Sequence, residues 1–190
     1  MDRRDALTKL TLLIGGAVSA PTFSAFMAGC SPPPAQGPYT PQSLSQDSFQ
    51  LVGELAELII PETDTPGALS AGVDRHIDDV LTEIFSSEQR RQFFIGMEDF
   101  SNRARVEYGA DLIELHPEQQ REFLVALEHE AFQGIRDSEP NAASFYRQVK
   151  ELTVTGYYTS EFGATMELHV MPYGSYRPIV PFEEIGKTWA

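Results

Sequence analysis

The chain has 190 residues, with 28 acidic against 14 basic side chains, and its formal net charge at pH 7 is −14. A surface this acidic repels phosphate backbones and anionic lipid headgroups, which argues against nucleic-acid binding and electrostatic membrane attachment. The length suits a single domain with a buried core. The one cysteine, Cys30, excludes an internal disulfide, a multi-thiolate metal site and an iron–sulfur cluster.

Residues 1–30 resemble a bacterial signal peptide. Basic residues precede a short apolar run, and small residues stand directly before Cys30. The apolar run is shorter than the about 20 residues that a membrane-spanning helix needs. Because small residues before a cysteine resemble the lipoprotein box, we expect Cys30 to be acylated and to become the first residue of the mature protein. The alternative is ordinary cleavage near residue 20 or 25, which leaves a free thiol.

The pair Arg3 and Arg4, followed by Leu7, resembles the twin-arginine signal, which exports proteins that have already folded. The match is partial, because Asp5 and Ala6 occupy the variable and aromatic positions of that signal. The mildly hydrophobic run behind them suits this route better than the general secretory one. We therefore expect export by the twin-arginine translocase to the periplasmic side of the membrane. The alternative is a general secretory signal that happens to hold two arginines.

Composition divides the chain into three regions. Residues 1–30 are the leader, residues 31–46 are rich in proline and poor in apolar side chains, and residues 47–190 carry helical periodicity. The middle region has too much proline for a helix, so we predict a flexible tether that holds the domain off a membrane surface.

The domain is predicted to be an all-α bundle of about five helices with an irregular tail at residues 169–190. The first helix is expected to be capped by Asp47 and to end at Pro61, and a turn-rich loop follows at residues 62–72. The second helix is expected at residues 73–85. Apolar residues at helical spacing predict the buried faces; they include Val73, Ile77, Leu81, Ile84, Phe93, Phe100, Phe123, Phe132, Phe145, Val149 and Val154.

Three local patterns mark where the later helices begin. Ser86 with Gln89 three places on forms a capping box for the third helix. Pro117 suits the first position of the fourth helix, and Asn141 the start of the fifth.

No motif for catalysis or metal binding is evident. The histidines lack the Glu-x-x-His spacing of di-iron bundles and the His-Glu-x-x-His spacing of metalloproteases, so we expect solvated residues on helix surfaces; they are His76, His116, His129 and His169. Phosphate-binding glycine loops and the nucleophile elbow do not occur either. We expect neither catalysis nor a bound cofactor in this chain. The alternative is an independent enzyme that uses surface carboxylates, but the sequence supplies no organised site for it.

Two segments stand out by their composition. In residues 58–68 an apolar helix end runs into a loop, where Thr63, Asp64 and Thr65 are expected to bond local backbone groups. In residues 152–161 two tyrosines follow a glycine near a helix end. Tyrosine is favoured at interfaces because it buries a large area at low entropic cost. The candidate partner interface is therefore Tyr157, Tyr158, Thr159 and Glu161; the alternative places the tyrosines within the bundle, with their hydroxyls at its rim.

Read together with the leader, these segments resemble the gluconate 2-dehydrogenase subunit 3 family. Three blocks of this chain are similar to segments of its members. Residues 54–61 read Glu-Leu-Ala-Glu-Leu-Ile-Ile-Pro, and residues 63–68 read Thr-Asp-Thr-Pro-Gly-Ala. Residues 152–161 match the pattern Leu-Thr-x-x-Gly-Tyr-Tyr-Thr-Ser-Glu. Members often carry a Gly-Cys segment in the tail, whereas this chain has no cysteine there.

The resemblance implies a small, non-catalytic subunit of a membrane-associated dehydrogenase of gluconate, sugars or polyols. In such complexes the large subunit is an FAD-containing flavoprotein of the glucose-methanol-choline type, and a multihaem cytochrome c subunit often receives the electrons. A flavin enzyme acquires its cofactor in the cytoplasm and must cross the membrane folded, so a small partner that bears the signal would carry it. The alternative function is a stand-alone periplasmic lipoprotein that binds another protein or ligand.

Overall fold

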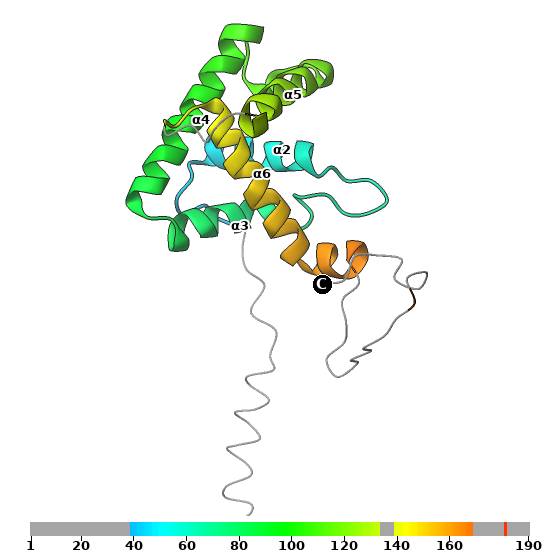
Figure 1. Ribbon diagram of the computed structural model, residues 1–190. Helices are drawn as coiled ribbons and strands as arrows, with labels where there is room; N and C mark the ends of the chain where they lie inside the picture. Colours follow the sequence, from blue (N-terminus) through cyan, green and yellow to red (C-terminus); the bar gives the residue numbers. More distant parts are fainter. Residues whose placement is uncertain (1–38, 134–138, 169–180, 182–190) are drawn as a thin grey trace, which may run out of the picture. The chain divides into compact units, whose positions relative to one another are not determined.

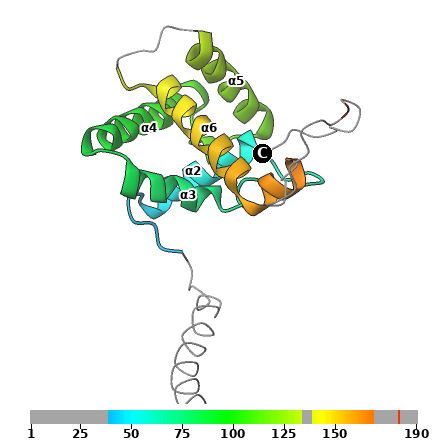
Figure 2. The same ribbon diagram turned by 60° about the horizontal axis from the view of Figure 1, so that its bottom comes forward.

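One helix, α6 (Ala142–Thr159), contacts nearly all the other helices of the domain. In the computed structural model, which describes residues 39–133, 139–168 and 181, it packs against α2 (Gln46–Ile59), α3 (Val73–Asp79), α4 (Ser87–Tyr108) and α5 (Pro117–Gln133). Figures 1 and 2 show α6, in yellow to orange, running between these helices. Three shorter elements complete the described chain: the π-helix η1 (Val80–Ile84), the 3₁₀-helix η2 (Leu112–Glu114) and the π-helix η3 (Gly163–Glu167).

The predicted all-α fold is confirmed, since the described residues contain helices and no strand. The leader, with Arg3, Arg4 and Cys30, lies outside the described residues. So does the predicted tail, apart from Pro181. What the sequence predicts for these two regions stays a prediction.

An aromatic cluster joins α4, α5 and α6. Phe93, Phe100, Phe123 and Phe145 are fully buried, and Phe145 lies edge-on to the rings of Phe93 and Phe100 at centroid distances of 5.0 and 5.2 Å. Phe100 meets Phe123 in the same way at 5.2 Å. Burial of one such side chain contributes about 1.5–3 kcal/mol, and edge-to-face pairing adds to it. The predicted inward positions of these four residues are confirmed.

The helix starts agree with the sequence in all cases but one. Ser86 and Gln89 form the predicted capping box, α5 begins at Pro117, and Asn141 caps α6. The prediction that Asp47 caps α2 is wrong, because the hydroxyl of Ser45 accepts the hydrogen bond from the backbone N–H of Ser48. Asp47 instead lies in the first turn, where a negative charge favours the helix dipole.

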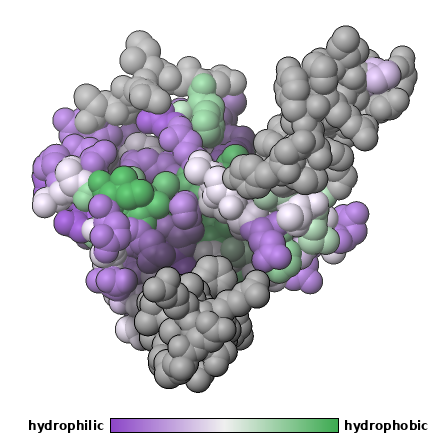
Figure 3. Space-filling model, turned by 90° about the horizontal axis from the view of Figure 1, so that it is seen from below, coloured by the Kyte–Doolittle hydropathy of each residue, from purple (hydrophilic) through white to green (hydrophobic). Residues whose placement is uncertain are grey.

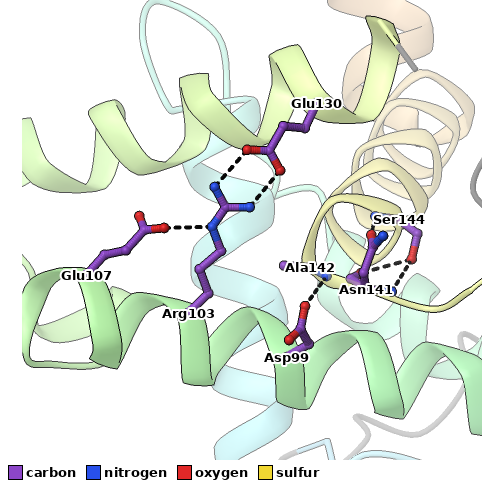
Figure 4. A network of polar contacts seen from close by, with 7 residues as sticks. All are labelled: Asp99, Arg103, Glu107, Glu130, Asn141, Ala142 and Ser144. Carbon is purple, nitrogen blue, oxygen red and sulfur yellow. Dashed lines mark hydrogen bonds and ion pairs between the residues drawn. The ribbon is translucent and has the colours of Figure 1, made fainter.

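Polar contacts outside the core also join α4 to α5 and α6 (Figure 4). Asp99 on α4 accepts a hydrogen bond at 2.8 Å from the backbone N–H of Ala142, in the first turn of α6. The guanidinium of Arg103 donates to both carboxylate oxygens of Glu130 on α5, at 2.6 and 2.8 Å, and to Glu107 on its own helix at 2.8 Å. The bond from Arg103 holds the pKa of the Glu130 carboxyl below its usual value.

Lys150 on α6 forms an ion pair with Glu128 on α5, and the hydroxyl of Tyr146 donates to the same carboxylate. Burial, together with the Glu128 charge, raises the pKa of the Tyr146 hydroxyl. Both contacts come from the first half of α6 and bind it to α5, whereas Gly156 in the second half lies against His76 of α3.

Three residues predicted to face inward are exposed instead. Ile84 is 71% exposed, because η1 is π-helical: the N–H of Phe85 bonds to the carbonyl of Val80, and the extra residue in this turn rotates Ile84 outward. Phe85 packs against the core in its place. Phe132 and Val154 are 52% and 40% exposed; on α6 it is Thr153 that lies fully buried.

The folded domain begins earlier than predicted. The backbone N–H groups of Gln42, Ser43 and Leu44 donate to the buried carboxylate of Asp78 on α3, at 2.7, 3.0 and 2.9 Å. Leu44 is itself buried, and Gln46 already belongs to α2. The prediction of a flexible tether over residues 31–46 is therefore wrong for residues 42–46, since Asp78 fixes them to the domain.

Asp78→Asn should destabilise the domain by about 2–3 kcal/mol. Asn offers one acceptor oxygen instead of two, so at least one N–H group would face an amide N–H₂ instead of a carboxylate, and the bonds that remain would lose their charge. Urea unfolding measures the change. The exposed Glu83→Gln should alter stability by less than about 0.5 kcal/mol. Equal stability of the two variants would show that this anchoring contributes nothing.

Candidate binding surface at the α2–α3 loop

Three sequence blocks, two of them consecutive and the third about 85 residues further along the chain, meet at one end of the domain. Residues 54–61 include the end of α2 and the start of the α2–α3 loop (residues 60–72), residues 63–68 lie in that loop, and residues 152–161 include the end of α6. The hydroxyl of Tyr157 donates to the carbonyl of Pro66 at 2.9 Å, across 91 positions of sequence. The blocks therefore build one local structure, a loop fixed between α2, α6 and η3.

Glu57 holds the loop from the α2 side. One oxygen of its carboxylate accepts a hydrogen bond from the N–H of Glu62 at 2.8 Å, and the other accepts one from the N–H of Leu69 at 2.9 Å. Gly67 lies against the same carboxylate, and a Cβ at this position would fall 2.2 Å from a carboxylate oxygen. The same Cβ would lie 2.6 Å from the backbone N of Glu62, so the loop can close over Glu57 in this way only with glycine there.

Tyr157 holds the loop from the α6 side. It is 1% exposed, and its ring packs edge-on against that of Tyr158 at 5.4 Å. The expectation that both tyrosines form a partner surface is therefore wrong for Tyr157, whose ring belongs to the core. Tyr158 is 39% exposed, and Thr159 and Glu161 are exposed as well. For these three the interface role stays a prediction.

The glycine before the two tyrosines lets α6 approach α3 closely. A Cβ on Gly156 would lie 2.6 Å from Cδ2 of His76 on α3. His76 is only partly exposed, and its Nε2 is buried without a hydrogen-bond partner in the described part of the chain. The prediction of a solvated His76 is therefore wrong. His116 and His129 are exposed as predicted, and His169 lies outside the described residues.

Of the two threonine hydroxyls in the loop, one reaches another element and the other stays within the loop. Thr65 donates its hydroxyl to Glu167 of η3 at 2.8 Å, and Thr63 donates its hydroxyl to Asp64. The predicted bonds from these hydroxyls to local backbone groups are therefore wrong; the local turn is held by the N–H of Thr63 and the carbonyl of Thr65. Glu167 and Glu57 are the supports that sequence reasoning missed, and only the position of Glu57 within a family block signalled it.

Away from the loop, an open pocket of about 340 Å³ lies between the start of α2, α4 and η2, and none of the three blocks lines it. Its lining mixes apolar Leu51, Met97 and Ile113 with charged groups, among them Arg105, which is paired with Asp111 at 2.9 Å.

Two further findings bear on the chemistry of this domain. Within the described ranges, no group of three or more His, Cys, Asp or Glu side chains is arranged to hold a metal ion. None of the helices described is both long and apolar enough to cross a membrane. The structure that the three blocks build is the α2–α3 loop. Charged and aromatic side chains hold its backbone, and Glu62, Thr63 and Asp64 are exposed to solvent.

These features define a small all-helical protein whose characteristic residues hold a surface loop. The family model of gluconate 2-dehydrogenase subunit 3 matches residues 46–181, and the chain belongs to this family. The match covers all three blocks and every helix described. No curated protein and no solved structure matches the chain.

Tyr157→Phe should lower the free energy of unfolding by about 1 kcal/mol, because the partly buried hydrogen bond to the carbonyl of Pro66 is lost. It should also speed hydrogen exchange at the N–H groups of Glu62 and Leu69, since the loop loses one of its supports. Tyr158→Phe is the matched control and should change neither property. If the two variants behave alike in urea unfolding and in exchange, the Tyr157 hydroxyl does not hold the loop.

Proposed function

We propose that this chain is the non-catalytic small subunit of an FAD-dependent dehydrogenase of gluconate, a sugar or a polyol. In the proposal it serves the export, maturation and membrane tethering of the flavoprotein subunit, which is of the glucose-methanol-choline type. The observation that carries the proposal is the family match over residues 46–181, which covers the whole helical domain.

The contacts made by residues of the three family blocks support a binding role for this chain over a catalytic one. Glu57 and Tyr157 direct their polar atoms at backbone groups of the loop, and Gly67 and Gly156 are needed for close packing. A catalytic group must instead present a polar atom to a substrate. The block residues act as supports, and what they present outward is a surface suited to another protein.

The cofactors belong to the partners in this proposal. FAD is assigned to the flavoprotein, haem to a multihaem cytochrome c subunit where one is present, and none to this chain. The flavoprotein folds around FAD in the cytoplasm, binds this subunit there, and crosses the membrane through the twin-arginine translocase under the signal that contains Arg3 and Arg4. The complex then works on the periplasmic side, anchored by lipid on Cys30.

Replacing both Arg3 and Arg4 by Lys should leave this chain and the flavoprotein in the cytoplasm. Lysine keeps the charge but lacks the planar guanidinium, so a general secretory signal would tolerate the exchange. The flavoprotein should still contain flavin and oxidise substrate in lysates. Cell fractionation and activity with an artificial electron acceptor measure the outcome, with Lys9→Arg as a control that preserves export. A flavoprotein that reaches the periplasm normally would restrict this chain to anchoring or stabilising the complex after export.

Cys30→Ala should move the chain, and the flavoprotein with it, from the membrane fraction to the soluble periplasmic fraction. A single acyl chain anchors a protein only weakly, so the several chains of a lipoprotein account for stable attachment. Ser31→Ala is the neighbouring control and should stay with the membrane. Fractionation followed by immunoblotting distinguishes the two. A wild-type protein that is already soluble, and unchanged by the substitution, would rule out the lipid anchor.

A further inference from the structure

Apolar side chains reach the surface where the end of α6 adjoins η3 and the α2–α3 loop. The four-residue spacing of Val154 and Tyr158 puts both on one side of α6, and Phe162 and Met166 repeat that spacing in the next helical stretch. η3 begins close against the end of α6, since a Cβ on Gly163 would lie 2.9 Å from Cα of Tyr158. Together with two residues of α2 and the loop we call these the docking surface, and each is 38–40% exposed: Leu58, Leu69, Val154, Tyr158, Phe162 and Met166.

The threonines beside these residues make the surface more apolar than the sequence suggests. Thr155, Thr159 and Thr165 are all exposed, but each hydroxyl donates to the backbone carbonyl four residues earlier, at 2.8, 2.7 and 2.6 Å. With the hydroxyl turned back to the helix, the methyl group is the part left to contact a partner. Figure 3 shows the domain from below Figure 1, the side on which α6 ends and η3 lies, and on this face hydrophobic groups gather in patches among hydrophilic ones.

The docking surface is held in place before anything binds. The ring of Tyr158 rests at right angles on the buried ring of Tyr157, and Tyr157 is fixed to the loop through Pro66. Thr65 and Glu167 join the loop to η3. Immobilising flexible side chains and loops costs free energy on association, so a surface that is already fixed binds with less of that cost.

Charge decides what kind of partner fits. Residues 46–72 contain five carboxylates and residues 151–168 contain three, and neither segment contains a lysine, arginine or histidine. Six of these eight carboxylates are exposed, among them Glu62, Asp64, Glu151 and Glu161. A second copy of the same surface or an anionic lipid surface would be repelled, whereas a protein surface with lysine and arginine at its edge would be attracted.

We propose that the docking surface binds the flavoprotein subunit, through a patch that is apolar at its centre and carries lysine and arginine at its edge. This inference rests on the proposed accessory function and adds to it the contact surface and the partner's chemistry. Tyr158 and Phe162 meet the apolar centre, and Asp64 and Glu161 face the basic edge.

The test measures binding of the full mature chain to the purified, FAD-loaded flavoprotein by surface plasmon resonance, at low and at high salt. Tyr158→Ala should weaken binding about thirtyfold, as expected for an aromatic residue at the centre of an interface. Val125→Ala, on the exposed side of α5, is the matched control and should bind like the wild type. Thermal unfolding of each variant separates lost binding from lost folding.

A pair of charge reversals tests the edge of the surface. Asp64→Lys with Glu161→Lys should slow association about tenfold at low salt and have little effect at high salt, because long-range attraction is screened. Glu118→Lys with Glu122→Lys changes the net charge equally, but on exposed positions of α5, and should slow association far less.

The outcomes separate this inference from the function on which it rests. If the wild type binds the flavoprotein, and the docking-surface variants bind as well as their α5 controls, the surface is wrong and the accessory role stands. If the wild type does not bind the flavoprotein, both fall. If sedimentation instead shows a dimer of this chain that Tyr158→Ala dissociates, the occupant is a second copy and the inference is overturned.

Discussion

The close approach of α6 to α3 at Gly156 is the constraint on which this end of the domain depends. The His76 ring occupies the space that any other residue at position 156 would need. With the helix axes fixed this close, the next residue, Tyr157, points into the core and reaches Pro66, while Tyr158 is turned outward. The path of the loop therefore depends on the absence of a single side chain on α6.

Local chemistry accounts for the parts of the fold that could be predicted. Capping by Ser86 and Asn141 and the opening of α5 at Pro117 depend on residues within a turn of one another, and the buried phenylalanines stand at helical spacing, so the sequence displays these features directly. The exposure of Ile84 could not be predicted in this way. It depends on a π-helical turn, and periodicity of 3.6 residues assumes that no such turn occurs.

The sequence indicated which segments carry the candidate surface, but not which of their residues hold the loop; the interface role of Tyr158, Thr159 and Glu161 stays a prediction. The blocks that resemble the family do surround the candidate surface, and Tyr158, Thr159 and Glu161 are exposed. Two adjacent tyrosines look equivalent in sequence, however, and only tertiary packing makes Tyr157 a buried support of the loop and leaves Tyr158 exposed. Glu57, Glu167 and Asp78 each bind backbone or side-chain groups far along the chain, and no local pattern marks such a role.

The anchoring of residues 42–44 by Asp78 has a mechanical consequence. If the chain is attached to a membrane at its N-terminus, as proposed, any pull on that attachment enters the domain at α3. Three hydrogen bonds on one carboxylate share such a load, and the buried side chain of Leu44 adds resistance to peeling. The force is thereby taken up near Asp78 and does not have to be carried by α2 alone. A subunit that holds a larger enzyme at a membrane would be strained at this point first.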